Sequence, residues 1–353
     1  MTTAPPALLA RATLRSLDPA VAGWLRCPRC RREVEQVSEA WRCTACHHEY
    51  PIVLGIPDFR LYEDPLIPLE DDYRKGEKLE RAAEHLTFAE LVRHYWTLPT
   101  YPPTPADVSA HSIHHVVTDA ARIAGYAGLL GTGRSLLDLG CGAGTLARAM
   151  RAQFAVTVGA DVGFRWLVVA RRGFEEAGLR PNLICCCADH LPFADGVFDT
   201  VASVSLLEHV PDAGAVIREC ARTMAQSGRV FVWTTNRYSL APEPHVRIWG
   251  VGFLPRRWMP AYVRWRRGLA YEKKHLLSRG ELARALGDAG LSVRQFAMPV
   301  VTAPDRAAMG FIQRMLAGAW AAASRVPLLG RAFLGVFPVL QVVAARPRPQ
   351  ERT

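Results

Sequence analysis

The chain has 353 residues, 50% of them hydrophobic, with a formal net charge of +10 and a pI near 9.4. This length excludes a lone small domain and indicates a main domain with a smaller module. The positive charge favours RNA, anionic lipid or an acidic substrate as a partner, although an Arg- and Ala-rich genome would give the same value.

The first 23 residues are expected to form a flexible lead. Met1–Leu17 has no acidic residue and contains Arg11 and Arg15, but it lacks the basic-then-apolar order of a secretory signal. The arrangement of the cysteines fits a reducing cytoplasm, because four have metal-binding spacing, three are consecutive and one lies in a glycine-rich turn. No uncharged apolar run is long enough for a membrane span, since Arg314 and Arg331 interrupt the best candidates.

Residues 24–60 carry two C-x-x-C knuckles. The four thiolates are those of Cys27, Cys30, Cys43 and Cys46. Two such knuckles predict a tetrahedral, structural zinc site. The segment is too short to bury a self-sufficient core, so the metal would supply much of its folding energy.

The end of this zinc ribbon reads Tyr50-Pro51-Ile52, followed by Gly55-Ile56-Pro57. It resembles the small zinc-ribbon proteins that serve as activator subunits of RNA and protein methyltransferases. A four-cysteine ribbon also precedes the catalytic domain of the bacterial 23S rRNA guanine methyltransferases. This resemblance implies either contact with RNA or a ribbon that only packs on a catalytic domain, and both remain open.

The sequence of residues 61–130 predicts charged helical stretches that are separated by a Pro-rich hinge near residues 99–105. One helix has an apolar face, formed at three- and four-residue intervals by Phe88, Leu91, Val92, Tyr95 and Trp96. His111 and His115 have the spacing of a metal pair, but no acidic third ligand lies nearby in sequence, so packed or solvated histidines are favoured.

Apolar runs predict seven strands, with helices between them, in residues 131–346. The runs lie near residues 135–139, 156–160, 182–187, 198–204, 229–234, 291–297 and 338–345. Their alternation with helices indicates an α/β, Rossmann-like fold, with a seven-stranded, mainly parallel sheet and helices on both faces. A ligand would then bind at the carboxyl ends of the central strands. Residues 347–353 form a tail.

The first of these strands runs into a glycine-rich turn and then a helix. Gly140, Gly142 and Gly144 follow Asp138, and Thr145–Met150 begins a helical pattern. Glycines suit a backbone that turns sharply against a ligand, and the helix N-terminus offers free N–H groups. An acid followed by x-G-x-G-x-G resembles the first motif of the class I S-adenosylmethionine (SAM) methyltransferases.

Two stretches extend this resemblance downstream. Val156–Asp161 resembles the strand that ends in the ribose-binding acid, and Ala188–Asp199 resembles the adenine-side loop of the ubiquinone/menaquinone-type branch. The resemblance implies a SAM-dependent methyltransferase in which residues 61–130 form a lid over the cofactor. The cofactor contacts that it implies are Asp138, Gly140, Cys141, Gly142, Gly144, Asp161, Val162, Asp189, His190 and Ser205.

Methyl transfer from a sulfonium is an in-line displacement, so the protein mainly aligns the reactants and excludes water. A general base is needed only for a weakly acidic acceptor. His209, in the stretch Leu206–Asp212, is the first candidate base and His245 the second. A structural role for His209 is the alternative.

An insertion at residues 236–280 interleaves arginines with aromatic residues. This pattern suits stacking on bases with phosphate contacts, a lipid headgroup interface, or a helical cap with a core of aromatics. Near the C-terminus, an apolar helix face predicts peripheral membrane contact or a roof over the acceptor pocket. Its residues are Ile312, Met315, Leu316 and Trp320.

Missing motifs narrow the acceptor. No Asn/Asp-Pro-Pro-Tyr/Phe motif follows the fourth strand and no Pro-Cys dipeptide occurs, which argues against the methylation of DNA amino groups and of cytosine C5. We therefore expect methyl transfer to O, N or C of a small-molecule or lipid-like intermediate. An rRNA or tRNA methyltransferase and a non-catalytic SAM-binding partner subunit are the alternatives.

Overall fold

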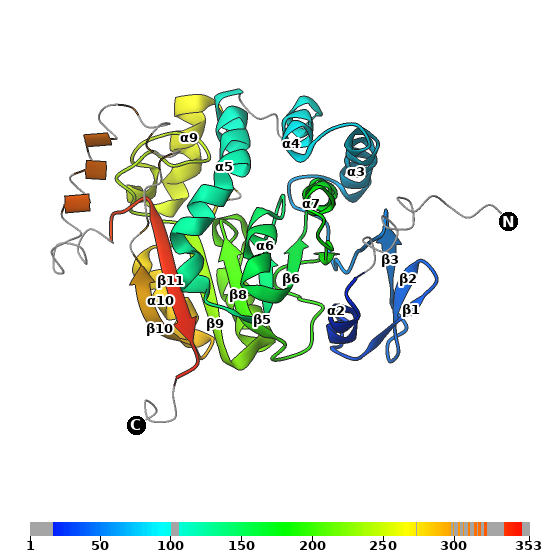
Figure 1. The fold of residues 1–353 in the computed structure, drawn as a ribbon. Coiled ribbons are helices and arrows are strands. Elements are labelled where there is room, and N and C mark those ends of the chain that lie inside the picture. Colours follow the sequence, from blue (N-terminus) through cyan, green and yellow to red (C-terminus); the bar gives the residue numbers. More distant parts are fainter. Residues whose placement is uncertain are drawn as a thin grey trace. The chain divides into compact units, whose positions relative to one another are not determined.

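The computed structural model describes residues 17–99, 106–272, 274–297 and 335–347, together with isolated positions between 299 and 322 (Figure 1). The chain divides into two compact units. The first comprises Met1–Val117, Thr132–Val201 and Arg222–Ala225, and the second comprises Thr118–Gly131, Ala202–Ala221 and Gln226–Thr353. Each unit is described by itself.

The first unit begins with a small antiparallel sheet that follows the short helix α2 (Pro19–Trp24). Its strands, in spatial order, are β1 (Val34–Val37), β2 (Ala40–Cys43), β3 (Glu49–Val53) and β4 (Ile56–Pro57). Tyr50 stacks on Phe59 with ring centroids 4.7 Å apart, and Trp41 lies 6.4 Å from the same ring. Three aromatic rings are a small core, so this sheet needs further cross-links.

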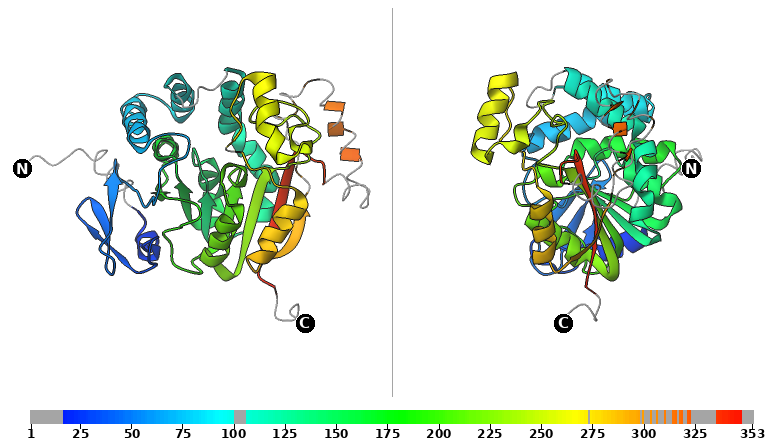
Figure 2. Two further views of the ribbon diagram at one scale, coloured as in Figure 1. Left: turned by 180° about the vertical axis from the view of Figure 1, so that it is seen from behind. Right: turned by 90° about the vertical axis from the view of Figure 1, so that its left-hand side faces the viewer.

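Two helices of this unit, α3 (Leu69–Ala83) and α4 (Phe88–Thr97), pack on α7 (Phe164–Glu176), as the views in Figures 1 and 2 show. A capping box begins α4, because the Thr87 side chain accepts from the N–H of Glu90 and the Glu90 carboxylate accepts from Thr87. Gly76 allows α3 to approach closely, since a Cβ there would lie 2.8 Å from the ring of Phe164. The next helix is α5 (Ala106–Leu130).

Seven strands form a mixed sheet in the order β10-β11-β9-β8-β5-β6-β7. Their bounds are β5 Gly133–Leu139, β6 Phe154–Asp161, β7 Leu183–Cys185, β8 Phe198–Val204, β9 Met224–Thr235, β10 Ser292–Ala297 and β11 Val339–Ala345. Pairing is parallel between β5 and β6 and between β6 and β7, whereas β11 is antiparallel to both β9 and β10. The expected fold class and all seven strands are confirmed.

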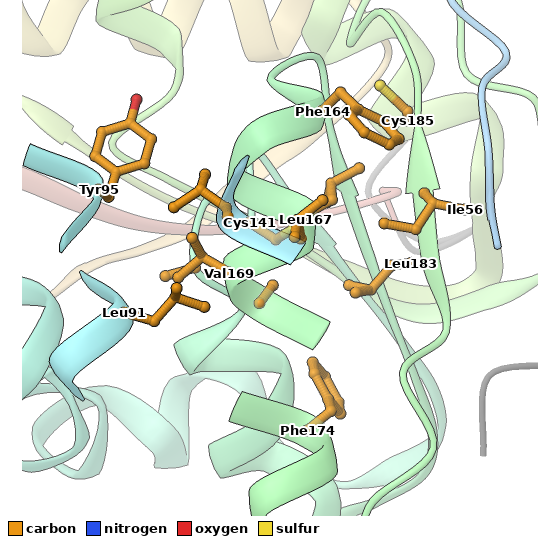
Figure 3. Close-up of a cluster of buried hydrophobic side chains, with 14 of the residues drawn as sticks. Ile56, Leu91, Tyr95, Cys141, Phe164, Leu167, Val169, Phe174, Leu183 and Cys185 are labelled. Carbon is orange, nitrogen blue, oxygen red and sulfur yellow. The ribbon is translucent and has the colours of Figure 1, made fainter. Parts of the chain in front are cut away.

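The core of the first unit lies around α7 (Figure 3). Leu167 and Phe174 of α7 are fully buried, together with Leu91 of α4 and Leu183 of β7. Cys141 of the glycine turn belongs to the same cluster. The turn between β5 and the short helix α6 (Thr145–Ala149) is therefore supported by a packed core. The 3₁₀ turn η1 (Met150–Ala152) follows α6.

The second unit has its own smaller core, made by Val251, Met259, Val263 and Tyr271 with two further residues. Besides strands of the seven-stranded sheet and the end of α5, it contains η2 (Leu207–His209), most of α8 (Ala213–Thr223), η3 (Val251–Phe253), η4 (Arg256–Trp258), α9 (Met259–Arg267) and α10 (Arg279–Asp288). A second capping box, between Ser278 and Glu281, begins α10.

Some expectations fall outside the described residues. These are most of the lead and tail, the side chains of His111 and His115, and Ile312, Leu316 and Trp320 of the C-terminal apolar face. Met315 of that face is described and exposed. Among the described helices, none combines the length and hydrophobicity needed to cross a bilayer. The domain boundaries expected after residues 23, 60, 130 and 346 stay predictions.

Candidate functional site

The glycine turn after β5 adopts a conformation that explains its sequence. Gly140, Gly142 and Gly144 have φ values of +75°, +48° and +67°, which residues with a Cβ rarely adopt. A Cβ at Gly144 would lie 3.0 Å from that of Ala170, whereas one at Gly142 would meet nothing within 4 Å. Gly144 therefore serves packing against α7, and Gly142 leaves open space beside its backbone.

Asp161, the last residue of β6, closes this turn. Its Oδ2 accepts the N–H of Gly142 at 2.8 Å, and its Oδ1 accepts the N–H of Gly163 at 2.8 Å. Burial raises the pKa of this carboxyl, and the two N–H groups oppose the rise. A carboxylate has about four acceptor sites, so Asp161 can hold the turn and still accept from a diol.

Asp138 and Cys141 are both buried. Asp138 Oδ2 accepts the N–H of Ala147, in the first turn of α6, at 3.0 Å. Gly144 is the N-cap of α6 and has no side chain, so Asp138 caps the helix from the neighbouring strand. A Cβ at Gly159 would lie 3.0 Å from the Cys141 sulfur, so Gly159 makes room for this thiol.

Asp189 lies in the loop after β7. The hydroxyl of Tyr62 donates a very short hydrogen bond to its Oδ1, and His190 Nδ1 lies 3.1 Å from the same oxygen. Burial and the Asp189 carboxylate raise the pKa of Tyr62. Tyr62 was not predicted from the sequence, because it precedes its partner by more than a hundred residues and has no motif around it.

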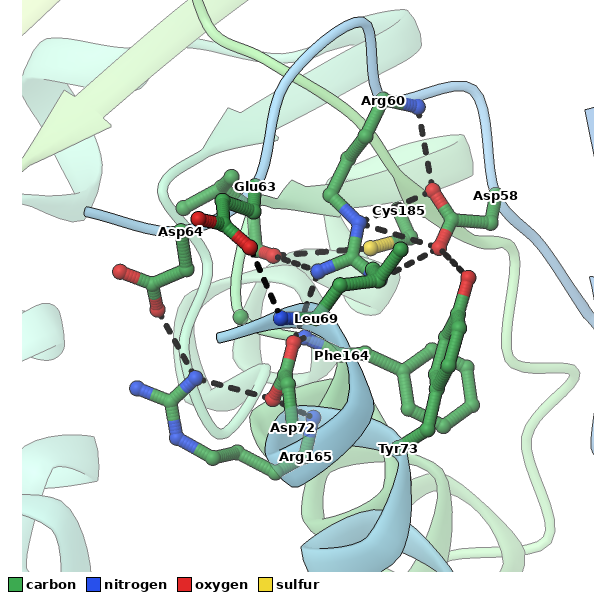
Figure 4. Close-up of polar contacts among 12 residues, drawn as sticks. Asp58, Arg60, Glu63, Asp64, Leu69, Asp72, Tyr73, Phe164, Arg165 and Cys185 are labelled. Carbon is green, nitrogen blue, oxygen red and sulfur yellow. Dashed lines mark hydrogen bonds and ion pairs between the residues drawn. The ribbon is translucent and has the colours of Figure 1, made fainter. Parts of the chain in front are cut away.

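A buried network of charges holds the backbone that follows Asp161 (Figure 4). Arg60 donates to the carbonyl of Val162 at 3.0 Å and to Asp72 at 2.7 Å. Asp72, which is 0% exposed, also accepts the backbone N–H groups of Phe164 and Arg165 at 3.0 and 3.1 Å. The remaining members are Asp58, Asp64 and Tyr73. The network fixes the entry into α7 next to the candidate ribose-binding acid.

The four expected cysteine ligands come together. The Sγ atoms of Cys27 and Cys46 are 3.7 Å apart, and those of Cys30 and Cys43 are 3.4 Å apart. Four sulfurs about 2.3 Å from a tetrahedral zinc ion would be roughly 3.8 Å apart. Burial raises the pKa of Cys43, but the N–H groups of Cys46 and Ala45 outweigh it and lower that pKa to about 6, which favours the thiolate. The donor set therefore fits zinc.

Backbone hydrogen bonds join the ribbon to the rest of the first unit. The N–H of Arg26 donates to the carbonyl of Pro192 at 2.9 Å, and the N–H of Ala194 donates to Trp24 at 2.8 Å. At the other end, the N–H of Phe59 donates to the carbonyl of Cys185 at 2.7 Å. The ribbon is therefore packed on both β7 and the loop that carries Asp189.

The second unit contains Ser205 and both candidate bases. Ser205 has a φ of +53°, and its N–H donates to the carbonyl of Trp233 at 2.8 Å. His209 and His245 face each other, with their Nε2 atoms 3.1 Å apart. Burial, Lys274 and His245 hold the pKa of His209 well below its usual range, so this imidazole is neutral at pH 7. Contact of these residues with a cofactor stays a prediction.

The chain is similar to known proteins over a region that includes this site. Residues 137–232 match the family model described as "Methyltransferase domain". Over 106 residues the chain is 43% identical to the ubiquinone biosynthesis O-methyltransferase of Vibrio campbellii, covering 30% of this chain and 45% of the relative. The Escherichia fergusonii protein of the same name is 39% identical over 106 residues, covering 30% and 44%. The chain thus spans less than half the length of these curated relatives.

Among solved structures, the geranyl diphosphate C-methyltransferase of Streptomyces coelicolor A3(2) matches with a TM-score of 0.46 at 18% identity, over 77% of this chain and 98% of that one. The matched residues 137–232 begin within β5 and end within β9, and they include the glycine turn, Asp161 and Asp189. Residues 137–232 are therefore a methyltransferase domain of the class I, SAM-dependent kind.

Proposed function

We propose that this protein transfers a methyl group from SAM to a hydroxyl oxygen of a small molecule. The observation that carries the proposal is the glycine turn closed by Asp161, with open space beside Gly142. The choice of oxygen rests on the 43% identity to a protein named as an O-methyltransferase. The proposal includes an acceptor that contains a ring or resembles a lipid.

SAM would supply the electrophilic methyl group, and the residues of the first unit would hold the rest of the molecule. Asp161 would accept the ribose hydroxyls, and the backbone of Gly140 and Gly142 would lie against the methionine portion. Asp189, oriented by Tyr62, would accept from the adenine amino group. Because displacement at a sulfonium needs little covalent help, alignment and exclusion of water would be the main contributions of the protein.

We further propose that Cys27, Cys30, Cys43 and Cys46 hold a structural zinc ion. The backbone docking of the ribbon supports a scaffold role. The other five cysteines, Cys141, Cys185, Cys186, Cys187 and Cys220, form no disulfide, and this supports a reducing compartment, the cytoplasm, as its location.

The first test is SAM binding by titration calorimetry with wild-type protein, Asp161→Asn and the matched control Glu70→Gln, whose side chain is 85% exposed. Asparagine keeps the shape but loses the charge, so we expect SAM affinity to fall about tenfold or more. Glu70→Gln should bind like the wild type. No binding of SAM by wild-type protein would refute the proposal, and an unchanged affinity in Asp161→Asn would place the ribose elsewhere.

The acceptor is tested by measuring S-adenosylhomocysteine formation with a panel of catechols, simple phenols, aliphatic alcohols, amines and thiols. We expect turnover with the hydroxyl compounds. Turnover with amines or thiols alone would correct the acceptor atom.

An RNA acceptor is the second candidate, favoured by one observation. No acidic residue lies between His245 and Tyr271, while six arginines do, and Trp249, Trp258 and Trp265 are exposed. Such a surface suits bases and phosphates, and it suits a membrane surface as well. The test is incubation of the protein with methyl-labelled SAM and total RNA. Label that enters the RNA and is released by nuclease digestion would favour an RNA acceptor over a small-molecule acceptor.

A further inference from the structure

Four side chains of the second unit form one continuous hydrogen-bonded row. Lys274 Nζ lies 2.7 Å from His209 Nδ1, and His209 Nε2 lies 3.1 Å from His245 Nε2. His245 Nδ1 makes a very short contact with Oε1 of Glu243. The row joins residues from η2, from the turn at 243–248 and from the segment before α10.

The chemistry of these groups allows one assignment of the protons. A lysine ammonium can only donate, so His209 Nδ1 must accept. A neutral His209 then has its proton on Nε2 and donates to His245 Nε2. His245 in turn has its proton on Nδ1 and donates to the Glu243 carboxylate. Every N–H in the row has an acceptor, and all of them point from the lysine toward the glutamate.

The surroundings fix the glutamate end of this row. The second carboxylate oxygen of Glu243 accepts the N–H of Val246 at 2.9 Å, and Pro244 restricts the backbone between Glu243 and His245. Two further titratable groups among the described residues lie beside the row, the Glu208 carboxylate and the Tyr271 hydroxyl. Glu208 is 1% exposed and accepts from Thr234 at 2.6 Å and from Thr235 at 3.1 Å.

Tyr271 is buried against this site. It is 2% exposed, and the charges of Glu243 and Glu208 add to burial in raising its pKa, so its hydroxyl remains protonated. The side chain of His245 is 22% exposed. Protons can therefore exchange with solvent at His245 but not at Tyr271.

A cation between Glu208, His209 and His245 is the competing arrangement, because one ligand atom of each lies within 4.8 Å of the others. The Lys274 contact opposes it. An ammonium group 2.7 Å from His209 repels a cation, and both histidine Nε2 lone pairs would have to be free, although one proton lies between them.

We propose that Lys274, His209, His245 and Glu243 form a proton relay that deprotonates the methyl acceptor. This proposal rests on the proposed function. Lys274 gives a proton to His209 Nδ1 while His209 Nε2–H passes to His245 Nε2 and His245 Nδ1–H passes to Glu243. Three N–H bonds break, and two N–H bonds and one O–H bond form. The Lys274 amine then takes the hydroxyl proton of the acceptor, and the alkoxide or phenoxide attacks the methyl group. In net terms one proton moves from the acceptor to Glu243.

The relay makes His245 and Glu243 positioning and proton-accepting partners of His209. It differs from a single imidazole base, because burial, Lys274 and His245 lower the pKa of His209 and so disfavour a second proton on this ring. A neighbour that takes the proton onward removes this difficulty.

The arrangement of protons is tested without any enzymatic activity, by ¹⁵N NMR of histidine-labelled protein at pH 7. His209→Gln and His245→Gln identify the two signals. We expect His209 to be neutral with its proton on Nε2 and His245 to have its proton on Nδ1. Lys274→Met should leave His209 as a mixture of both tautomers. A proton on His209 Nδ1, or joint displacement of both histidine signals by Mg²⁺ or Zn²⁺, would overturn the relay.

The proton transfer is tested with Glu243→Gln and the control Glu272→Gln, whose carboxylate is half exposed and bonds to Arg264. A glutamine oxygen can still accept from His245 but cannot take its proton. With catechol as the acceptor probe, we expect kcat of Glu243→Gln to fall about 100-fold at pH 7, to recover as the pH rises, and to leave the KM for SAM unchanged. Glu272→Gln should keep wild-type kcat.

A fall of kcat in Glu243→Gln that is equal at every pH would indicate lost structure and overturn the relay, as would an unchanged kcat. If wild-type protein methylates no member of the acceptor panel, the proposed function fails, and the tautomers observed by NMR still decide whether the row exists.

Discussion

At the scale of a single residue, Lys75 has an unusual pKa because of its surroundings. Its side chain lies in the first unit, with Nζ 3.7 Å from the centre of the Tyr95 ring and 3.3 Å from the carbonyl of Pro99. Burial and the nearby Arg165 cation lower its pKa to about 7, against the opposing charge of Asp72. The Tyr95 ring favours the ammonium form, so it moderates this effect.

This pKa makes stability depend on pH. In the unfolded chain Lys75 titrates near 10.4, so between about pH 7 and pH 10 the unfolded state binds more protons than the folded state. The free energy of unfolding should therefore rise with pH across this range, by up to about 1.4 kcal/mol per pH unit. Urea denaturation at pH 7 and pH 9 measures it.

Lys75→Met is expected to remove this contribution, and Lys78→Met, at an exposed position of the same helix, is expected to retain it. Equal pH dependence in the wild type and Lys75→Met would show that Lys75 keeps an ordinary pKa.

At the scale of an element, α7 depends on a residue of another helix. Its own N-cap is Gly163, which has no side chain to accept the first N–H groups. Asp72 of α3 accepts those of Phe164 and Arg165 instead, and it also pairs with Arg60 and Arg165. One carboxylate thus caps a helix and neutralises two buried guanidinium groups.

Asp72→Ala should therefore destabilise the protein by about 3–5 kcal/mol, because it leaves two buried cations without this carboxylate. SAM affinity should fall as well, since α7 begins three residues after Asp161. Chemical denaturation and calorimetry measure the two effects. The control is Asp71→Ala, whose side chain is 52% exposed and bonds only at the surface to Arg74. Similar losses in both variants would contradict the capping role.

The sequence predicted the strands and the glycine turn but not this network. The strands could be found because their residues are buried and apolar in continuous runs, as in Val230–Val232. The role of Asp72 could not be predicted, because Asp72 follows Glu70 and Asp71 in a helix whose charged sequence is typical of an exposed helix. Its partner Arg165 lies 93 residues away, and single-sequence patterns carry no information on such pairings. The row from Lys274 to Glu243 escaped prediction for the same reason.

For the molecule as a whole, the four-cysteine ribbon lies in the first unit together with the part of the methyltransferase domain that contains Asp161 and Asp189. Arg31 donates to the carbonyl of Leu191 at 2.8 Å, and the N–H of Arg26 donates to Pro192, so the ribbon supports the loop that contains Asp189. Loss of the metal should therefore also disturb the proposed cofactor site.

Removal of zinc by a strong chelator, or Cys43→Ser, is expected to unfold the ribbon first and to weaken SAM binding, because the Asp189 loop loses its support. Metal analysis, circular dichroism and SAM calorimetry on the same samples follow the three events. Freshly purified protein without zinc would refute the metal site. Zinc-free protein that binds SAM with full affinity would refute the support of the loop.

The docking of the ribbon has a consequence for how such a protein can diversify. Three of its attachments, at Trp24, Arg26 and Phe59, use backbone N–H and carbonyl groups on the ribbon side. Substitutions at the exposed positions of β1, Glu35, Gln36 and Val37, would leave those attachments in place. Proteins that evolve from this chain can thus change the exposed surface of the ribbon while the backbone hydrogen bonds between the ribbon and the rest of the first unit stay the same.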